Sequence, residues 1–323
     1  MAERHGHDAR SSGSSELSAR RERRLRLVFA LNLAIVAAQA GWGIAAHSLG
    51  LVADAGHNLT DGVAVALSLI AVRLTRRKAT EQRSYGWHRS GVLAAQANAA
   101  GVVAITSLIA FEAVNRLRNP EPVDGAVVVL VALGAMVANG LAALLLREPG
   151  NPDLNMRSAL LHMASDAAAS AGVALTGLVI LWTDGYYWLD PVASLLIGLL
   201  IAVAAIRLIR ATTSVLLEST PEGLDLTALL ATMAAVDGVE DVHDVHAWSL
   251  SSDVRALSAH LVMVGHPTLE AAQAVAGEVR LVIAERFAIA HATLELECET
   301  CFDGDDDPCA MDQLDVLIRP HTH

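Results

Sequence analysis

The chain of 323 residues is 53% hydrophobic and only 18% charged, and its mean hydropathy is +0.42. Soluble proteins rarely have this balance, and several apolar runs exceed the roughly 20 residues that a membrane-spanning helix needs. The composition therefore excludes an ordinary soluble protein and predicts an integral membrane protein. The net charge of −12 is uneven, because residues 218–323 contain 20 Asp and Glu but only four Arg. Such an acidic region argues against a nucleic-acid partner and is compatible with cations.

The first segment, residues 1–25, is polar, and arginines cluster where it meets the first apolar run. The short apolar run and small-residue cleavage site of a signal peptide are not found near the start of the sequence. We therefore expect a disordered basic arm at the inner membrane surface. His5 and His7 lie in this arm, and the sequence gives them no definite role.

Six apolar segments within residues 26–217 predict a domain of six transmembrane helices. The segments cover about residues 26–46, 49–73, 91–115, 124–146, 157–182 and 190–216. The link after the second segment is rich in Lys and Arg, whereas the link before it has none. Because basic loops stay in the cytoplasm, both chain termini are predicted to be cytoplasmic. Arg116 and Arg118 are the exception to this rule, and Glu121 and Asp124 partly offset them.

The pattern changes after residue 217 from transmembrane to soluble. Residues 221–236 and 268–287 have the apolar spacing of helices, and Thr268 is the expected N-cap of the second. Residues 239–250, 254–264 and 291–297 alternate as strands do. The order αββαβ predicts a small cytosolic α+β domain at 218–298, ferredoxin-like, with both helices on one face of the sheet. Residues 299–323 are predicted to be a loose acidic tail.

Ionisable residues lie inside two of the predicted spans. His57 and Asp61 are four residues apart in the second span, and His162 and Asp166 are four apart in the fifth. Residues at this spacing share one face of a helix, so two facing helices would bring two imidazoles and two carboxylates together. Such a set suits Zn²⁺ or a similar divalent ion, although one His–Asp pair alone could be structural. Asp54 shares the face of His57, and we expect it to have a supporting role.

A second group of metal-type residues lies in the soluble domain. His243 and His260 are on adjacent predicted strands and Glu297 ends the third, so the three could converge at one end of the sheet. His246 is three residues from His243, and the strand period of two predicts that they lie on opposite faces.

The three cysteines are all close to the C-terminus, which favours metal or redox chemistry over a disulfide scaffold. Cys298 and Cys301 form a Cys-x-x-Cys pair that could bind a metal. The roles of Cys309, His321 and His323 remain open.

Five motifs resemble the cation diffusion facilitator family, in particular its zinc-transporting branch. They are HSLGLVADAGHNLTDG, SYGWHR, LHMASDAAAS, WLDPVASLLIG and VHDVHAW. The resemblance implies an obligate homodimer that exchanges cytosolic Zn²⁺ for protons by alternating access. It assigns the transport site to the two His–Asp pairs.

The resemblance also implies roles for residues outside the spans. It places cytosolic metal sites at His243, His260 and Glu297, with the Cys-x-x-Cys pair holding a further ion. The counterpart of Arg89 pairs with an acid at the end of the sixth span, which here matches Glu218. We hypothesise that Arg89 and Glu218 form a charge hinge between the membrane and soluble domains.

The chain departs from the family pattern in two places. It lacks the histidine-rich loop that many members carry between the fourth and fifth spans, and Gly91 occupies a position where a Glu is common. His88 stands alone before the third span and is expected to be structural.

These patterns together predict a divalent cation efflux transporter, not an enzyme, in the cell membrane of a bacterium with a GC-rich genome. A membrane-embedded zinc hydrolase is the alternative, but it would need an open coordination position that four protein ligands do not leave. A metal sensor would not explain polar groups in mid-membrane. Cd²⁺, Co²⁺ and Fe²⁺ remain competitors of Zn²⁺, because such sites follow general affinity order.

Overall fold

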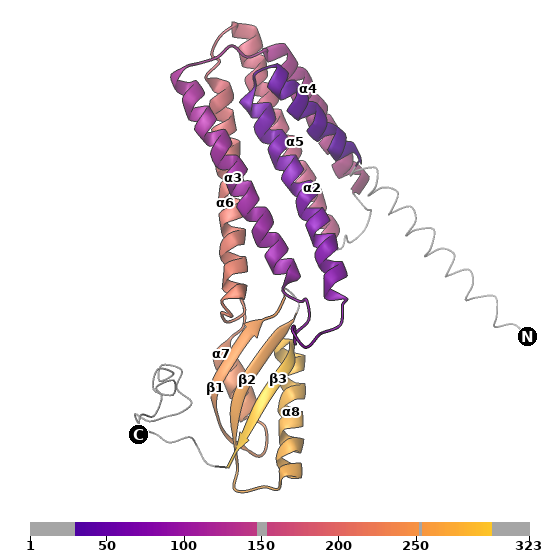
Figure 1. Cartoon of the computed structure of the whole chain (residues 1–323), viewed down its shortest axis with the longest axis vertical. Helices are drawn as coiled ribbons and strands as arrows, with labels where there is room; N and C mark the ends of the chain where they lie inside the picture. The colour runs from indigo at the N-terminus through magenta and orange to yellow at the C-terminus, as the bar shows by residue number, and fades with distance from the viewer. Residues whose placement is uncertain (1–29, 147–153, 252–253, 299–323) are drawn as a thin grey trace, which may run out of the picture. The chain divides into compact units, whose positions relative to one another are not determined.

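The computed structural model describes residues 30–146, 154–251 and 254–298 (Figure 1). These residues belong to two compact units. The first contains residues up to 70 together with 94–209, and the second contains residues 71–93 together with those from 210 onward.

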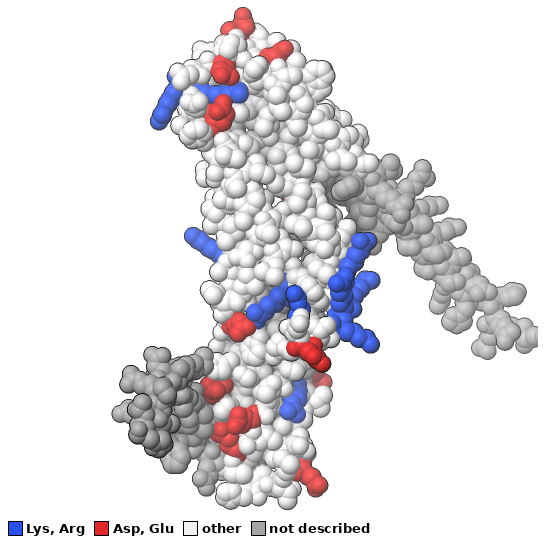
Figure 2. All heavy atoms as spheres, viewed as in Figure 1, with Lys and Arg blue, Asp and Glu red and all other residues white. Residues whose placement is uncertain are grey.

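The first unit is a bundle of long helices that lie side by side (Figure 1). After a helix at Ala30–Ala45, the chain forms α2 (Leu49–Thr75), α3 (Ser90–Arg118), α4 (Gly125–Leu146), α5 (Leu154–Thr183) and α6 (Leu189–Leu216). All five numbered helices are long and apolar enough to cross a membrane, and the described part of the first segment is shorter. Figure 2 shows that the visible face along these helices is largely uncharged. The helical membrane fold predicted from the sequence is confirmed.

The closest packing in the bundle is between α4 and α5. A Cβ added to Gly177 would lie 2.7 Å from Cγ1 of Val128, and one added to Gly125 would lie 2.7 Å from the backbone nitrogen of Leu181. Small residues let the two backbones approach each other, as is common between helices in membranes. The contact places α5, and with it the second His–Asp pair, firmly in the bundle.

A buried carboxylate fixes the start of α2. Asp190, in the first turn of α6, accepts hydrogen bonds from the Ser48 hydroxyl at 2.6 Å and from the backbone N–H groups of Leu49 at 2.6 Å and Gly50 at 3.2 Å. These N–H groups have no partner within their own helix, and the helix dipole favours a negative charge at this end. Asp190 therefore caps a helix to which it does not belong.

Arg116, an exception to the rule that basic residues lie on the cytoplasmic side, has its charge balanced by nearby acidic residues. The guanidinium group of Arg116 lies 3.2 Å from Glu112 and 3.7 Å from Glu121, and it also donates to the backbone carbonyl of His47. His47 has a positive φ of 55°, in the turn before α2. The Arg116 guanidinium group therefore stabilises the turn at His47.

The second unit contains a three-stranded sheet with two helices. Its elements are α7 (Leu226–Ala234), β1 (Val239–Ser249), β2 (Arg255–Met263), α8 (Leu269–Phe287) and β3 (Ile289–Glu297). The strand order is β1-β2-β3, with β1 antiparallel and β3 parallel to β2. Asp225 and Thr268 cap the two helices through their side-chain oxygens. The αββαβ order and the cap at Thr268 are confirmed.

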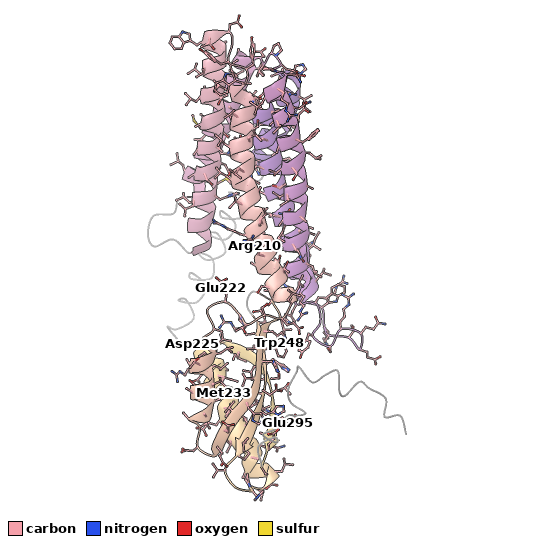
Figure 3. The ribbon with its side chains drawn as sticks, turned by 90° about the vertical axis from the view of Figure 1, so that its left-hand side faces the viewer. Arg210, Glu222, Asp225, Met233, Trp248 and Glu295 are labelled. Carbon is pink, nitrogen blue, oxygen red and sulfur yellow. The ribbon has the colours of Figure 1, made fainter. Side chains whose placement is uncertain are left out.

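The two faces of the sheet have different chemistry. Leu257, Leu261 and Met263 of β2 are buried in a core with Met233 of α7 and Val279 of α8. Alternate residues of each strand point away from this core. Figure 3 shows the labelled Met233 on the side of the helices and Glu295 on the other side of the sheet. The helix-free face is therefore polar, and it carries the candidate ligands described below.

Candidate metal sites

The structure brings the two intramembrane His–Asp pairs together, with one pair on α2 and the other on α5. Nε2 of His57 lies 3.4 Å from Oδ1 of Asp166, and Nε2 of His162 lies 3.3 Å from Oδ2 of Asp61. Within each helix the His and Asp side chains are 3.7 Å apart. The His57 and His162 rings meet nearly perpendicularly, with their centroids 6.2 Å apart. One ligand atom from each of His57, Asp61 and Asp166 lies within 4.8 Å of the others. His162 lies beside this group, with Nε2 3.3 Å from Asp61 and 3.7 Å from Asp166.

The spacing of these side chains suits a bound metal ion. Zinc bonds to nitrogen and oxygen are about 2.1 Å long, which places tetrahedral ligands about 3.4 Å from one another. The four His–Asp contacts are 3.3 to 3.7 Å long, and they involve both ring nitrogens of His57 and both carboxylate oxygens of Asp166. Oδ2 of Asp61 and both carboxylate oxygens of Asp166 are buried and make no hydrogen bond among the described residues. Buried oxygens of this kind are costly unless a cation or a donor meets them.

Asp54 has a different environment, although it shares the face of His57. It is fully buried, and its Oδ2 accepts hydrogen bonds from Gln39 at 2.5 Å and from Ser170 at 2.8 Å. The Gln39 side chain also accepts a hydrogen bond from Asn58 at 3.1 Å. Asp54 therefore connects α2 to the helix Ala30–Ala45 and to α5, in keeping with the supporting role expected for it. Sequence reasoning did not identify Gln39 or Ser170 as its partners.

The polar face of the sheet holds a second cluster. Nε2 of His243 lies 3.3 Å from Oε2 of Glu297, and Nδ1 of His260 lies 2.8 Å from Oε1 of the same carboxylate. One ligand atom from each of the three residues lies within 4.8 Å of the others. Nε2 of His243 is buried and makes no hydrogen bond among the described residues. Three protein ligands with a free imidazole lone pair fit a divalent cation.

The cysteines do not join this cluster among the described residues. Cys298 is exposed just after β3 and is not one of the three converging residues. Cys301 lies outside the described residues, so a metal site at the Cys-x-x-Cys pair stays a prediction. Cys309, His321, His323, His5 and His7 lie outside them as well.

One expectation about the sheet is wrong. His243 and His246 were expected on opposite faces, but His243 pairs with His260 and His246 pairs with Ser258, and the register shifts between them. His260 and Ser258 are two residues apart on β2, so they share a face, and their partners share it too. The cause is a β-bulge in β1 at Asp244, whose φ is 47°. The extra residue returns His246 to the face of His243.

The predicted ion pair outside the spans is also formed. A guanidinium nitrogen of Arg89 donates to Oε1 of Glu218, and both residues belong to the second unit. The structure therefore brings the two side chains together, but it does not test a hinge role.

Comparison with known proteins agrees with this architecture. The family described as the cation efflux transmembrane domain matches residues 25–217, and the cation efflux protein cytoplasmic domain matches residues 221–299. The chain is 33% identical over 303 residues to zinc transporter ZitB of Escherichia coli K12, covering 93% of each chain.

Two further relatives have names that refer to other metals or to metal cations in general. The cadmium, cobalt and zinc/H(+)-K(+) antiporter of Bacillus subtilis is 30% identical over 259 residues, 80% of this chain and 83% of that protein. The metal cation efflux system protein CzcD of Cupriavidus metallidurans is 30% identical over 286 residues, 88% and 89% of the two chains. The chain therefore belongs to the cation diffusion facilitator family of multi-pass membrane transporters that export divalent metal ions.

Proposed function

We propose that this transporter exports Zn²⁺ from the cytosol in exchange for protons, and that His57, Asp61, His162 and Asp166 bind the ion during transport. The observation that carries this proposal is the contact spacing of 3.3 to 3.7 Å around the buried, unbonded oxygens of Asp61 and Asp166. Two carboxylates balance the charge of a divalent ion. The loaded site is then close to neutral, which lowers the cost of holding the ion within the membrane.

Exchange for protons follows from the chemistry of the ligands. Imidazole binds a metal only when it is neutral, and a carboxylate binds only when it is ionised, so protons and metal compete for the same atoms. A site that opens alternately to the two sides of the membrane would release metal where protons are abundant. The name of the Bacillus subtilis relative, an antiporter of metals and H(+), supports this interpretation.

A hydrolase is not supported by this geometry. Catalytic zinc sites keep a coordination position open for water, whereas the transport site that we propose fills its four positions with protein ligands. Cd²⁺ and Co²⁺ are credible further substrates, since the names of two relatives include metals other than zinc or metal cations in general.

We further propose that the cluster of His243, His260 and Glu297 binds a divalent cation on the cytosolic side. The free Nε2 of His243 and the approach of both rings to one carboxylate support this assignment. In the arrangement we infer, the chain works as a homodimer in the cell membrane with both termini in the cytoplasm. Arg89 and Glu218 then act as a charge hinge near the membrane surface.

Flux measurements in proteoliposomes test the proposed function. Zn²⁺ is added outside vesicles whose interior is more acidic than the medium. Wild-type protein should then accumulate zinc inside, and it should not do so without the pH gradient. His57→Ala should abolish this flux. Thr176→Ala, a half-buried position on α5 outside the His–Asp cluster, is the matched control and should keep this flux. Cd²⁺, Co²⁺ and Mn²⁺ tested in the same way would define the substrate range. Zinc flux that persists in inserted His57→Ala protein would refute the site.

A further inference from the structure

The bulge in β1 places a carboxylate beside the cytosolic cluster. Asp244 is the extra residue of the bulge, and its φ of 47° is in the left-handed region that non-glycine residues seldom adopt. Without the bulge, strand alternation would send the side chain after His243 toward the core. Asp244 instead lies on the polar face and is a quarter exposed.

Asp244 connects two histidines on this face. Its Oδ1 lies 2.8 Å from Nε2 of His246, and its Oδ2 lies 3.5 Å from Nε2 of His260. The other ring nitrogen of His260, Nδ1, is the one that faces Glu297. The His260 ring is therefore placed between a carboxylate at the cluster and a carboxylate behind it.

This arrangement resembles the general design of metal-binding histidines. A ligating imidazole almost always gives its second N–H to a carboxylate or carbonyl, which fixes the tautomer and the direction of the lone pair. Glu295 also reaches Nε2 of His260 at 3.5 Å, but its side chain is 67% exposed. Asp244 is more buried, and His246 holds its second oxygen, so Asp244 is the better defined of the two partners.

We propose that Asp244 is a positioning residue for the cytosolic cation site. When the cation is bound, the carboxylate of Asp244 accepts the Nε2–H group of His260. The lone pair of Nδ1 is then directed to the cation, beside Glu297. This inference rests on the proposed cytosolic site. His246 contributes by orienting Asp244, which explains why the bulge keeps both residues on the polar face.

The backbone of Asp244 offers an unusually clean test. Glycine adopts a positive φ without steric cost, so Asp244→Gly removes the carboxylate and relieves the backbone at the same time. Asn also tolerates this region, and Asp244→Asn keeps an acceptor oxygen. Glu240→Gln, at an exposed position of the same strand, is the matched control.

Zinc affinity should be measured by chelator competition on the full chain in nanodiscs. A background of His57→Ala, Asp166→Ala, Cys298→Ser and Cys301→Ser removes the other metal sites proposed for this chain. Asp244→Gly should weaken binding about tenfold or more, which is typical for loss of a partner behind a ligand. Asp244→Asn should recover most of this loss, and Glu240→Gln should match the background.

NMR of protein with ¹⁵N-labelled histidine gives a readout that is separate from affinity and transport. In the zinc-loaded background protein the Nε2–H group of His260 should give one resonance that exchanges slowly with water, and Asp244→Gly should shift this resonance and speed its exchange. Unchanged affinity or an unchanged Nε2–H resonance in Asp244→Gly would overturn the proposal. His260→Ala separates the two ideas: if zinc binding survives it, the cytosolic site itself is wrong. If only His260→Ala weakens binding, the site stands and the role of Asp244 is wrong.

Discussion

Removal of Asp166 should affect stability and zinc binding in opposite directions. The residue is 1% exposed in the middle of α5, and neither of its carboxylate oxygens makes a hydrogen bond among the described residues. Its nearest polar neighbours are the imidazoles of His57 and His162, at 3.4 and 3.7 Å. A buried carboxylate that lacks short hydrogen bonds is unfavourable while the metal is absent. Asp166→Ala should therefore fold at least as stably as wild type without zinc, but it should lose the gain that zinc provides.

The increase in unfolding free energy that zinc provides can be calculated from the affinity of the folded protein for zinc. At a zinc concentration one hundred times the dissociation constant, binding stabilises the wild type by about 2.7 kcal/mol. Loss of a partner behind a ligand already weakens metal sites about 10- to 100-fold, so loss of a ligand should weaken binding by about 100-fold or more. At the same zinc concentration the variant would then gain at most about 0.4 kcal/mol.

Unfolding of the purified protein with and without zinc measures both effects. A His260→Ala background removes the contribution of the cytosolic cluster, and Thr176→Ala reports on an ordinary substitution in the same helix. Zinc stabilisation of about 2 kcal/mol or more in Asp166→Ala would show that the carboxylate is not a ligand. A zinc-free variant destabilised by several kcal/mol would show instead that Asp166 is a structural residue.

Two substitutions test the framework around the sites. Asp190→Ala leaves the N–H groups of Leu49 and Gly50 without their acceptor, so we expect a loss of about 2 kcal/mol in unfolding free energy, with zinc affinity retained in the protein that still folds. Equal stability of variant and wild type would contradict the capping role. For the hinge, Arg89→Glu and Glu218→Arg should each reduce zinc flux, and the double variant should recover part of it. A double variant no more active than either single one would argue against the pair.

The intramembrane cluster was predictable because it depends on local geometry. In a helix, residues four apart always share a face, so the spacing alone is enough to pair His57 with Asp61. The same holds for His162 and Asp166. Only the approach of α2 to α5 had to be assumed, and the cost of polar groups in lipid made that assumption reasonable.

The sheet was less predictable, because a single extra residue changes which face every later side chain occupies. The sequence VHDVHAW alternates well enough to predict a strand, but it contains no glycine to indicate a positive φ. Asp244 is one of the few residue types that can replace glycine there, and this signal is weak in one sequence. The faces of His243 and His246 therefore could not be assigned without the pairing register.

Three acids buried in the helices illustrate what sequence alone does not distinguish. Asp54, Asp166 and Asp190 are all nearly inaccessible. Asp190 accepts three hydrogen bonds. One oxygen of Asp54 accepts two, and its other oxygen has no hydrogen bond among the described residues, so donors of the protein meet each of these carboxylates at least on one side. Asp166 has no such donor among the described residues, and the imidazoles at its oxygens are themselves metal ligands by type. A buried acid is thus assigned to structure or to transport by its partners, and these come from other helices that its own sequence neighbours do not reveal.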